Sequence, residues 1–187
     1  MVSESSIPIT ISGSTTTEVS FTKSEDIAVE AVELVTTADA VIAGGQVTVR
    51  ETNVGSTVSS AIETGNIKVY KYISITKLNI KDTDLQKAKI RFEVPVSWLN
   101  CNGVDPKSIK LNRLVSNSWV PLTTLVLSSD QARYVYEAET PGFSTFAISG
   151  VQKLTAFQII DAIRGFYAGT SKLTAFDIID LIRRFYA

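Results

Sequence analysis

The sequence contains no histidine, and this absence removes the residue most often used as a general base near neutral pH. Without histidine the chain can build neither a Ser-His-Asp triad nor a Cys-His pair, and it lacks the commonest metal ligand. It also shows no phosphate-binding glycine loop and no dinucleotide-binding fingerprint. We therefore predict a non-enzymatic protein with no catalytic residues, no cofactor and no metal site.

Three further absences narrow the class of protein. The single cysteine, Cys101, permits no disulfide within the chain, and we expect its thiol to be buried. The formal net charge is −1, so there is no basic excess to neutralise phosphates, and we expect no nucleic-acid partner. No apolar run reaches the length of about 18 residues that a transmembrane helix requires, and no charged start leads into an apolar signal-peptide core.

The chain from Ile7 to Ile148 has the composition of β-structure. Short segments rich in Val, Ile, Thr, Tyr and Phe alternate apolar with polar residues, and Gly, Asn, Asp and Pro interrupt them. Their spacing predicts a mainly β fold, an antiparallel immunoglobulin-like β-sandwich over residues 1–150. The predicted strands are 7–11, 18–22, 27–34, 46–51, 67–75, 88–94, 108–114, 119–122, 125–127, 134–138 and 145–148. Residues 27–34 also fit a turn of helix, and short helical turns are predicted at 83–86 and 97–99.

A duplication follows the predicted sandwich, within residues 151–187. Residues 153–168 read KLTAFQIIDAIRGFYA and residues 172–187 read KLTAFDIIDLIRRFYA, which match at 13 of 16 positions. Each block has helical periodicity, with Thr155 and Thr174 as predicted N-caps and Gly169 placed for a left-handed helix end. The short link between the blocks predicts an α-helical hairpin.

Each block carries a broad apolar face, and we predict that this face binds a protein partner because exposed apolar patches mark interfaces. The alternative is a hairpin that closes against its own sandwich. The predicted interaction residues are Phe157, Ile160, Ile163, Phe166, Tyr167, Phe176, Ile179, Ile182, Phe185 and Tyr186.

Residues 7–148 resemble a family of archaeal surface modules, the PGF-pre-PGF domain. The segments that carry the resemblance are Val69–Lys77, Phe92–Leu99, Asn102–Pro106 and Tyr136–Ile148, the last of which contains Pro141-Gly142-Phe143. The resemblance implies a β-sandwich of extracellular or surface-layer proteins. The chain departs from that pattern after Gly150, where the helical blocks replace a Thr-rich stalk and an apolar anchor.

The duplicated blocks also resemble the helices of dockerin modules, which bind cohesin domains. Dockerin helices follow calcium loops rich in carboxylates, whereas the residues before these blocks, 149–153 and 169–172, carry none. The resemblance implies a calcium-free, dockerin-like pair whose partner is a cohesin-like receptor or another copy of the chain.

Two alternatives to a structural role stay open. Asp82-x-Asp84 and Glu25-Asp26 could bind calcium, although solvated turns are the simpler interpretation. Six aromatic residues could form a sugar-binding platform, although such residues more often fill a sandwich core; they are Tyr70, Tyr72, Trp98, Trp119, Tyr134 and Tyr136.

The sequence thus predicts a non-catalytic archaeal extracellular protein, a building block of a surface layer or filament, whose helix pair docks onto other subunits or partners. The alternative is a glycan- or calcium-binding adhesion module. Exposed edge strands offer a second route to assembly by strand addition, with the segment Ile7–Phe21 as the predicted donor.

Overall fold

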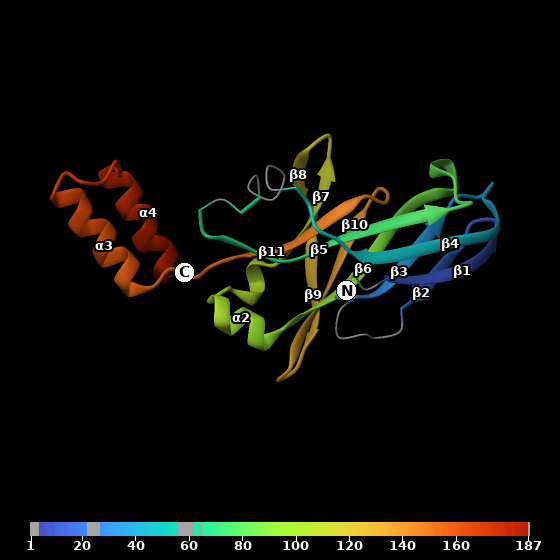
Figure 1. Ribbon diagram of the computed structural model, residues 1–187, viewed down its shortest axis with the longest axis horizontal. Helices are drawn as coiled ribbons and strands as arrows, with labels where there is room; N and C mark the ends of the chain where they lie inside the picture. Colours follow the sequence, from blue (N-terminus) through green and yellow to red (C-terminus); the bar gives the residue numbers. More distant parts are fainter. Residues whose placement is uncertain (1–3, 22–26, 56–61, 64, 187) are drawn as a thin grey trace. The chain divides into compact units, whose positions relative to one another are not determined.

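The computed structural model describes residues 4–21, 27–55, 62–63 and 65–186. The chain divides into two compact units, Met1–Val151 and Gln152–Ala187. The first unit contains two antiparallel sheets and the second contains a pair of helices (Figure 1). This confirms the prediction of a mainly β sandwich followed by a C-terminal helical hairpin.

The first sheet has six strands in the order β1-β4-β5-β11-β7-β8. Every neighbouring pair in it is antiparallel. The strands are β1 (Glu4–Ser12), β4 (Val41–Glu51), β5 (Ile67–Leu78), β11 (Thr145–Val151), β7 (Lys110–Val115) and β8 (Ser118–Pro121).

The second sheet has five strands in the order β2-β3-β6-β10-β9, again all antiparallel. They are β2 (Thr16–Ser20), β3 (Val29–Thr36), β6 (Leu85–Pro95), β10 (Arg133–Thr140) and β9 (Thr124–Ser129). Three short helical segments lie between strands: η1 (Asp82–Asp84), α2 (Val96–Asn102) and η2 (Pro106–Ser108).

Strand alternation explains why the sheets pack face to face. In β6, Ile90, Phe92 and Val94 are fully buried, while the intervening charged residues lie on the outer face. Successive side chains of a strand point to opposite faces, so one face of β6 contributes to the core and the other remains in water. The outer face is then held by ion pairs between neighbouring strands, such as Lys89–Glu33 at 2.8 Å.

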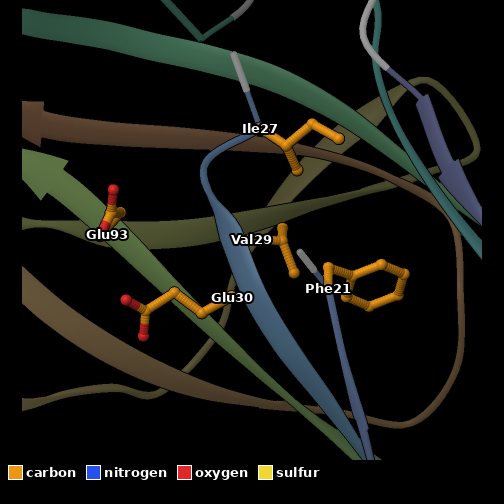
Figure 2. A pocket seen from close by; sticks show the side chains of 5 residues that line it. All are labelled: Phe21, Ile27, Val29, Glu30 and Glu93. Atoms are coloured by element: carbon orange, nitrogen blue, oxygen red, sulfur yellow. The ribbon is translucent and has the colours of Figure 1, made fainter. Parts of the chain in front are cut away.

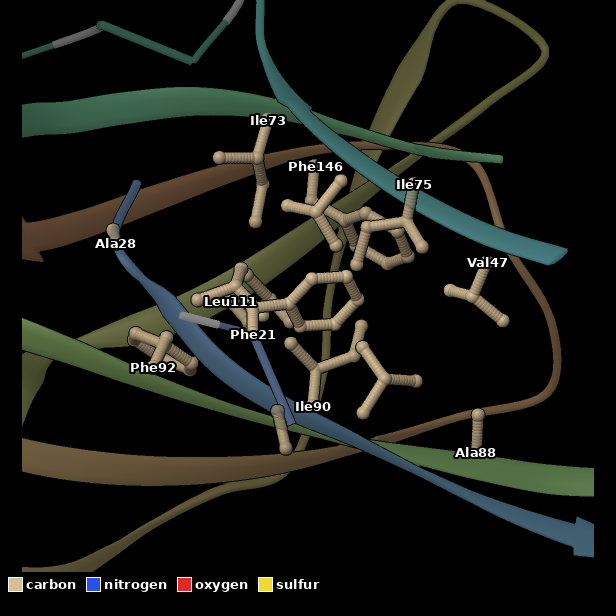
Figure 3. Packing of buried hydrophobic residues seen from close by; sticks show 14 of the residues in the cluster. Phe21, Ala28, Val47, Ile73, Ile75, Ala88, Ile90, Phe92, Leu111 and Phe146 are labelled. Atoms are coloured by element: carbon tan, nitrogen blue, oxygen red, sulfur yellow. The ribbon is translucent and has the colours of Figure 1, made fainter. Parts of the chain in front are cut away.

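The core lies between the two sheets (Figure 3). Ile73, Ile75 and Phe146 enter it from the first sheet, and Ile90 with Phe92 enter it from the second. Because all the residues of this core cluster belong to the first unit, the sandwich has the apolar interior that an independently folding domain needs.

One expectation about this unit is wrong. Cys101 is exposed rather than buried, because α2 turns Leu99 toward the core and leaves Cys101 on the solvent side. The predicted donor segment, Ile7–Phe21, forms two strands that are each the edge of a sheet, so strand addition through it stays a prediction. Its two strands pair within their own sandwich, β1 with β4 and β2 with β3.

Candidate interaction surface of the helix pair

The two helices of the second unit begin at equivalent capped positions. In α3 (Ala156–Tyr167), the backbone N–H of Gln158 donates to Thr155 Oγ1 at 3.2 Å, and the backbone N–H of Thr155 donates to Gln158 Oε1 at 2.9 Å. In α4 (Ala175–Tyr186), Thr174 and Asp177 exchange the corresponding bonds at 3.3 and 2.7 Å. Each helix therefore begins with a capping box that satisfies backbone donors otherwise left without partners.

The first helix ends at a turn that reverses the chain. Gly169 has a φ of +67°, and its N–H donates to the Phe166 carbonyl at 3.1 Å, while the Thr170 N–H donates to the Gly165 carbonyl at 3.0 Å. This pair of hydrogen bonds is a Schellman motif, in which the residue in the left-handed conformation is usually glycine. The chain then returns into α4, and the two helices run antiparallel (Figure 1).

Equivalent isoleucines are the most buried side chains of the two helices. Ile159 is 8% exposed and Ile178 is 9% exposed. The predicted interaction residues did not include them, although their spacing to Ile163 and Ile182 is the i, i+4 spacing of a helix seam. The half-buried predicted residues are Ile163, Phe166 and Ile182.

Most of the other predicted residues form an exposed apolar strip beside this buried seam. Phe157 is 70% exposed and Phe176 is 83% exposed, and each lies three residues before an exposed isoleucine, Ile160 or Ile179. Tyr167 and Phe185 are also exposed. The side chain of Tyr186 lies outside the described residues. We call Phe157, Ile160, Tyr167, Phe176 and Ile179 the apolar flank.

Helical geometry separates the flank from the buried seam. Positions 157, 160 and 167 lie within about 80° of rotation on α3, whereas Phe157 and Ile159, two residues apart, point in nearly opposite directions. Two antiparallel helices that bury equivalent positions are related by an approximate two-fold axis normal to their common plane. A rotation about that axis keeps Ile160, Tyr167 and Ile179 on one side of the hairpin, and Phe157 and Phe176 lie toward its two outer edges.

Charged groups lie among and beside the flank residues. Asp161, Arg164, Asp180 and Arg183 are all exposed and recur at equivalent positions of the repeats. At the start of α4, hydrogen bonds from the Thr174 hydroxyl and backbone N–H hold the pKa of the Asp177 carboxyl below its ordinary value. The border of the flank thus carries both signs of charge.

The acidic clusters considered for calcium have structural partners where they are described. Asp82 forms a 2.7 Å ion pair with Lys77, and Asp84 accepts a 2.9 Å hydrogen bond from the Lys81 backbone. Glu25 and Asp26 lie outside the described residues. Within the part of the chain that is described, no group of three or more His, Cys, Asp or Glu side chains gathers as a metal site would require.

The aromatic side chains considered for sugar binding belong mainly to the sandwich core. Tyr136 is buried and stacks on Phe92 with ring centroids 5.4 Å apart. Tyr70, Trp98 and Tyr134 pack against the core cluster as partly buried residues. These four residues therefore pack in or against the core instead of forming a flat exposed platform. The other two, Tyr72 and Trp119, are half-buried with ring centroids 5.8 Å apart, and sugar binding stays a prediction.

A pocket of about 170 Å³ lies at one end of the sandwich, lined by Phe21, Ile27, Val29, Glu30 and Glu93. Figure 2 shows the two carboxylates on one side and Phe21 with Val29 on the other. Burial, together with the hydrogen bond and negative charge of Glu93, raises the pKa of Glu30. The pocket is smaller than the roughly 300–1,000 Å³ of typical small-molecule sites.

No helix among the described residues is both long and apolar enough to cross a bilayer. Neither a scan against models of known protein families nor a search of curated proteins finds a match to this chain. The resemblances to archaeal surface modules and to dockerins therefore stay predictions.

Proposed function

We propose that this protein is a non-catalytic, extracellular building block of an archaeal surface assembly, and that its helix pair docks onto a protein partner. The observation that carries the proposal is the apolar flank, in which Phe157 and Phe176 expose most of their side chains at equivalent positions. Leaving large apolar surfaces in water is unfavourable by about 25 cal/mol per Å², and covering them drives association.

The composition of the flank favours a protein as the partner. Large aromatic and aliphatic side chains contribute most of the flank, and exposed Asp and Arg residues lie among and beside them. Aromatic residues and arginine are enriched at protein–protein interfaces. Another copy of the chain is the first partner to test, and a cohesin-like receptor is the second.

The sandwich supplies the other half of the proposed role. Its two sheets have a continuous core of their own, which makes the unit a rigid carrier for a docking element. The location outside an archaeal cell rests on the resemblance of residues 7–148 to surface modules.

Deletion of Gln152–Ala187 tests the proposal, because the structure ends the sandwich at Val151 and leaves its core intact. We expect light scattering to show more subunits per particle for the full chain than for the truncated chain, after each mass is divided by that of its own subunit. Equal monomer masses for the two proteins, together with no binding to a cohesin domain, would overturn it.

A paired substitution locates the contact more sharply. Phe157→Ser with Phe176→Ser removes the two most prominent phenyl groups of the flank, and we expect association to weaken roughly tenfold or more, as for loss of aromatic interface anchors. Lys153→Ser with Lys172→Ser is the matched control, since both lysines are exposed and precede the helices. Equal association of both variants would place the contact elsewhere.

A further inference from the structure

The strand β9 forms an edge of the second sheet. It pairs with β10 on one side, and among the described residues no strand lies on its other side. Such an edge presents a row of backbone N–H and C=O groups that can pair with another chain, so soluble proteins usually protect it with proline, charge or short length.

The other three edge strands carry such protection. β1 has Pro8, which cannot donate a backbone hydrogen bond, and β2 has Glu18 at its centre. β8 is only four residues long and ends at Pro121. Apolar side chains of β1 and β2 are also better covered: Ile9 and Ile11 of β1 are buried, and so is Val19 of β2.

β9 differs from these edges in every respect. Its sequence TLVLSS has neither proline nor charge, and Leu125, Val126 and Leu127 are consecutive exposed apolar residues. Leu125 pairs with Glu137, whose side chain lies on the outer face, while Val126 pairs with the buried Tyr136. Apolar surface is therefore available on both faces of the strand.

One irregularity lies within β9. The pairing with β10 shifts between Val126 and Ser128, so Leu127 has no residue opposite it and forms a bulge. A bulge adds local twist and can weaken edge pairing, but here it leaves Thr124–Val126 in regular register. It also adds the Leu127 side chain to the exposed apolar surface.

The absence of charge extends beyond the strand. Residues 114–129 form an uninterrupted run of 16 residues with no Asp, Glu, Lys or Arg, although 20% of the chain is charged. A run of this length would contain about three charges at the average frequency. It covers β8, which pairs with β7 in the first sheet, and the whole of β9, and the exposed Val115 and Val120 belong to it as well.

We propose that β9 is a strand-pairing surface whose occupant is the β9 strand of a second copy of this chain. Antiparallel pairing of two identical strands is two-fold symmetric and closes after two subunits. Because the strand is uncharged, its apposition to itself brings no like charges together. The pairing would join two five-stranded sheets into one sheet of ten strands and cover the exposed leucines of each copy with those of the other.

This contact uses no residue of the helix pair, so it stands or fails independently of the function proposed above. It differs from strand donation by Ile7–Phe21, whose strands pair on one side within the sandwich.

The test compares two lysine substitutions in the full chain by sedimentation velocity and amide hydrogen exchange. Leu125→Lys places a charge on the β9 edge, whereas Val41→Lys places one on β4, where the side chain is 74% exposed. Circular dichroism confirms that both variants fold.

We expect Leu125→Lys to weaken self-association roughly tenfold or more, as charged edge residues do, and Val41→Lys to leave it unchanged. We also expect amide exchange at residues 124–127 to slow as the wild-type concentration rises, and this dependence to vanish in Leu125→Lys. Exchange at β9 that does not depend on concentration, or equal masses for wild type and Leu125→Lys, overturns the proposal.

Discussion

Arg133 Nη1 lies 2.6 Å from Glu93 Oε2, across adjacent strands β10 and β6, and the same nitrogen lies 3.8 Å from Glu30 Oε1 on β3. Two carboxylates of the second sheet therefore share one guanidinium group. The closer carboxylate takes the strong, charge-assisted hydrogen bond. The other is left partly buried beside a like charge, and burial together with Glu93 raises its pKa.

This asymmetry predicts opposite effects for two conservative substitutions. A raised pKa means that Glu30 contributes stability below its unfolded pKa and loses that contribution as the pH rises through its folded pKa. Glu30→Gln should therefore raise Tm at pH 7 by roughly 1–2 °C, with a smaller gain near pH 4. Glu93→Gln, which loses the negative charge that strengthens the hydrogen bond from Arg133, should cost about 0.5–1.5 kcal/mol at pH 7. Thermal unfolding at both pH values checks the pair, and equal shifts of the same sign would contradict it.

A close approach in β11 gives the second prediction. A Cβ on Gly150 would lie 2.5 Å from Val104 Cγ1 and 2.7 Å from Ile109 Cδ1, and both residues belong to the core. Gly150→Ala should therefore destabilise the sandwich by about 1–3 kcal/mol through overpacking. Gly142→Ala is the control, because its nearest atom, Arg113 Nη2, lies 3.6 Å away. Denaturant unfolding measures both, and a neutral Gly150→Ala would show that the neighbouring side chains can move aside.

Local patterns predicted the sandwich well because strand alternation is a local consequence of burial. The alternating segment Ala88–Val94 lies within β6 with the expected inward face. Strand partners are set by contacts between residues far apart in sequence. For this reason residues 7–11 were correctly predicted as a strand, but their pairing with β4 was not. The exposure of Cys101 depends on the rotational phase of a single short helix.

The helix pair was predicted from a stronger signal, its duplication. The caps at Thr155 and Thr174 and the turn at Gly169 follow from residue type and spacing alone. The apolar face is wider than one neighbouring helix can cover, so the sequence did not show which part is turned inward. The structure places Ile159 and Ile178 in the seam and leaves Phe157 and Phe176 in solvent.

The duplication also provides an internal comparison for pH dependence. Hydrogen bonds from Thr174 lower the pKa of Asp177 below its ordinary value of 3.8, whereas the equivalent Gln158 does not titrate. A lowered pKa gives stability that is present above the unfolded pKa and is lost as the pH falls through the folded pKa. Below about pH 4 the first turn of α4 should therefore fray while that of α3 remains.

Backbone chemical shifts of residues 156–159 and 175–178 measure this difference between pH 7 and pH 3. Asp161 and Asp180 occupy equivalent positions, so the acidic residue that distinguishes the two first turns is Asp177. In Asp177→Gln the two helices should respond equally to pH. Equal fraying of both helices in the wild type would show that the Asp177 cap does not stabilise α4.

The last prediction concerns the two proposed contacts together. If β9 pairs with a second copy and the apolar flank docks onto another, each chain has two separate contacts, and a row of subunits can grow. The Leu125→Lys variant should then assemble only as far as the oligomer held by the helices. The variant with Phe157→Ser and Phe176→Ser should assemble only as far as the dimer held by β9. Combining all three substitutions should give a monomer.

Sedimentation velocity over a range of concentrations distinguishes these outcomes. Each contact should persist without the other. If the Leu125→Lys variant is a monomer, the proposed helix contact is therefore wrong, and if the phenylalanine variant is a monomer, the proposed β9 contact is wrong.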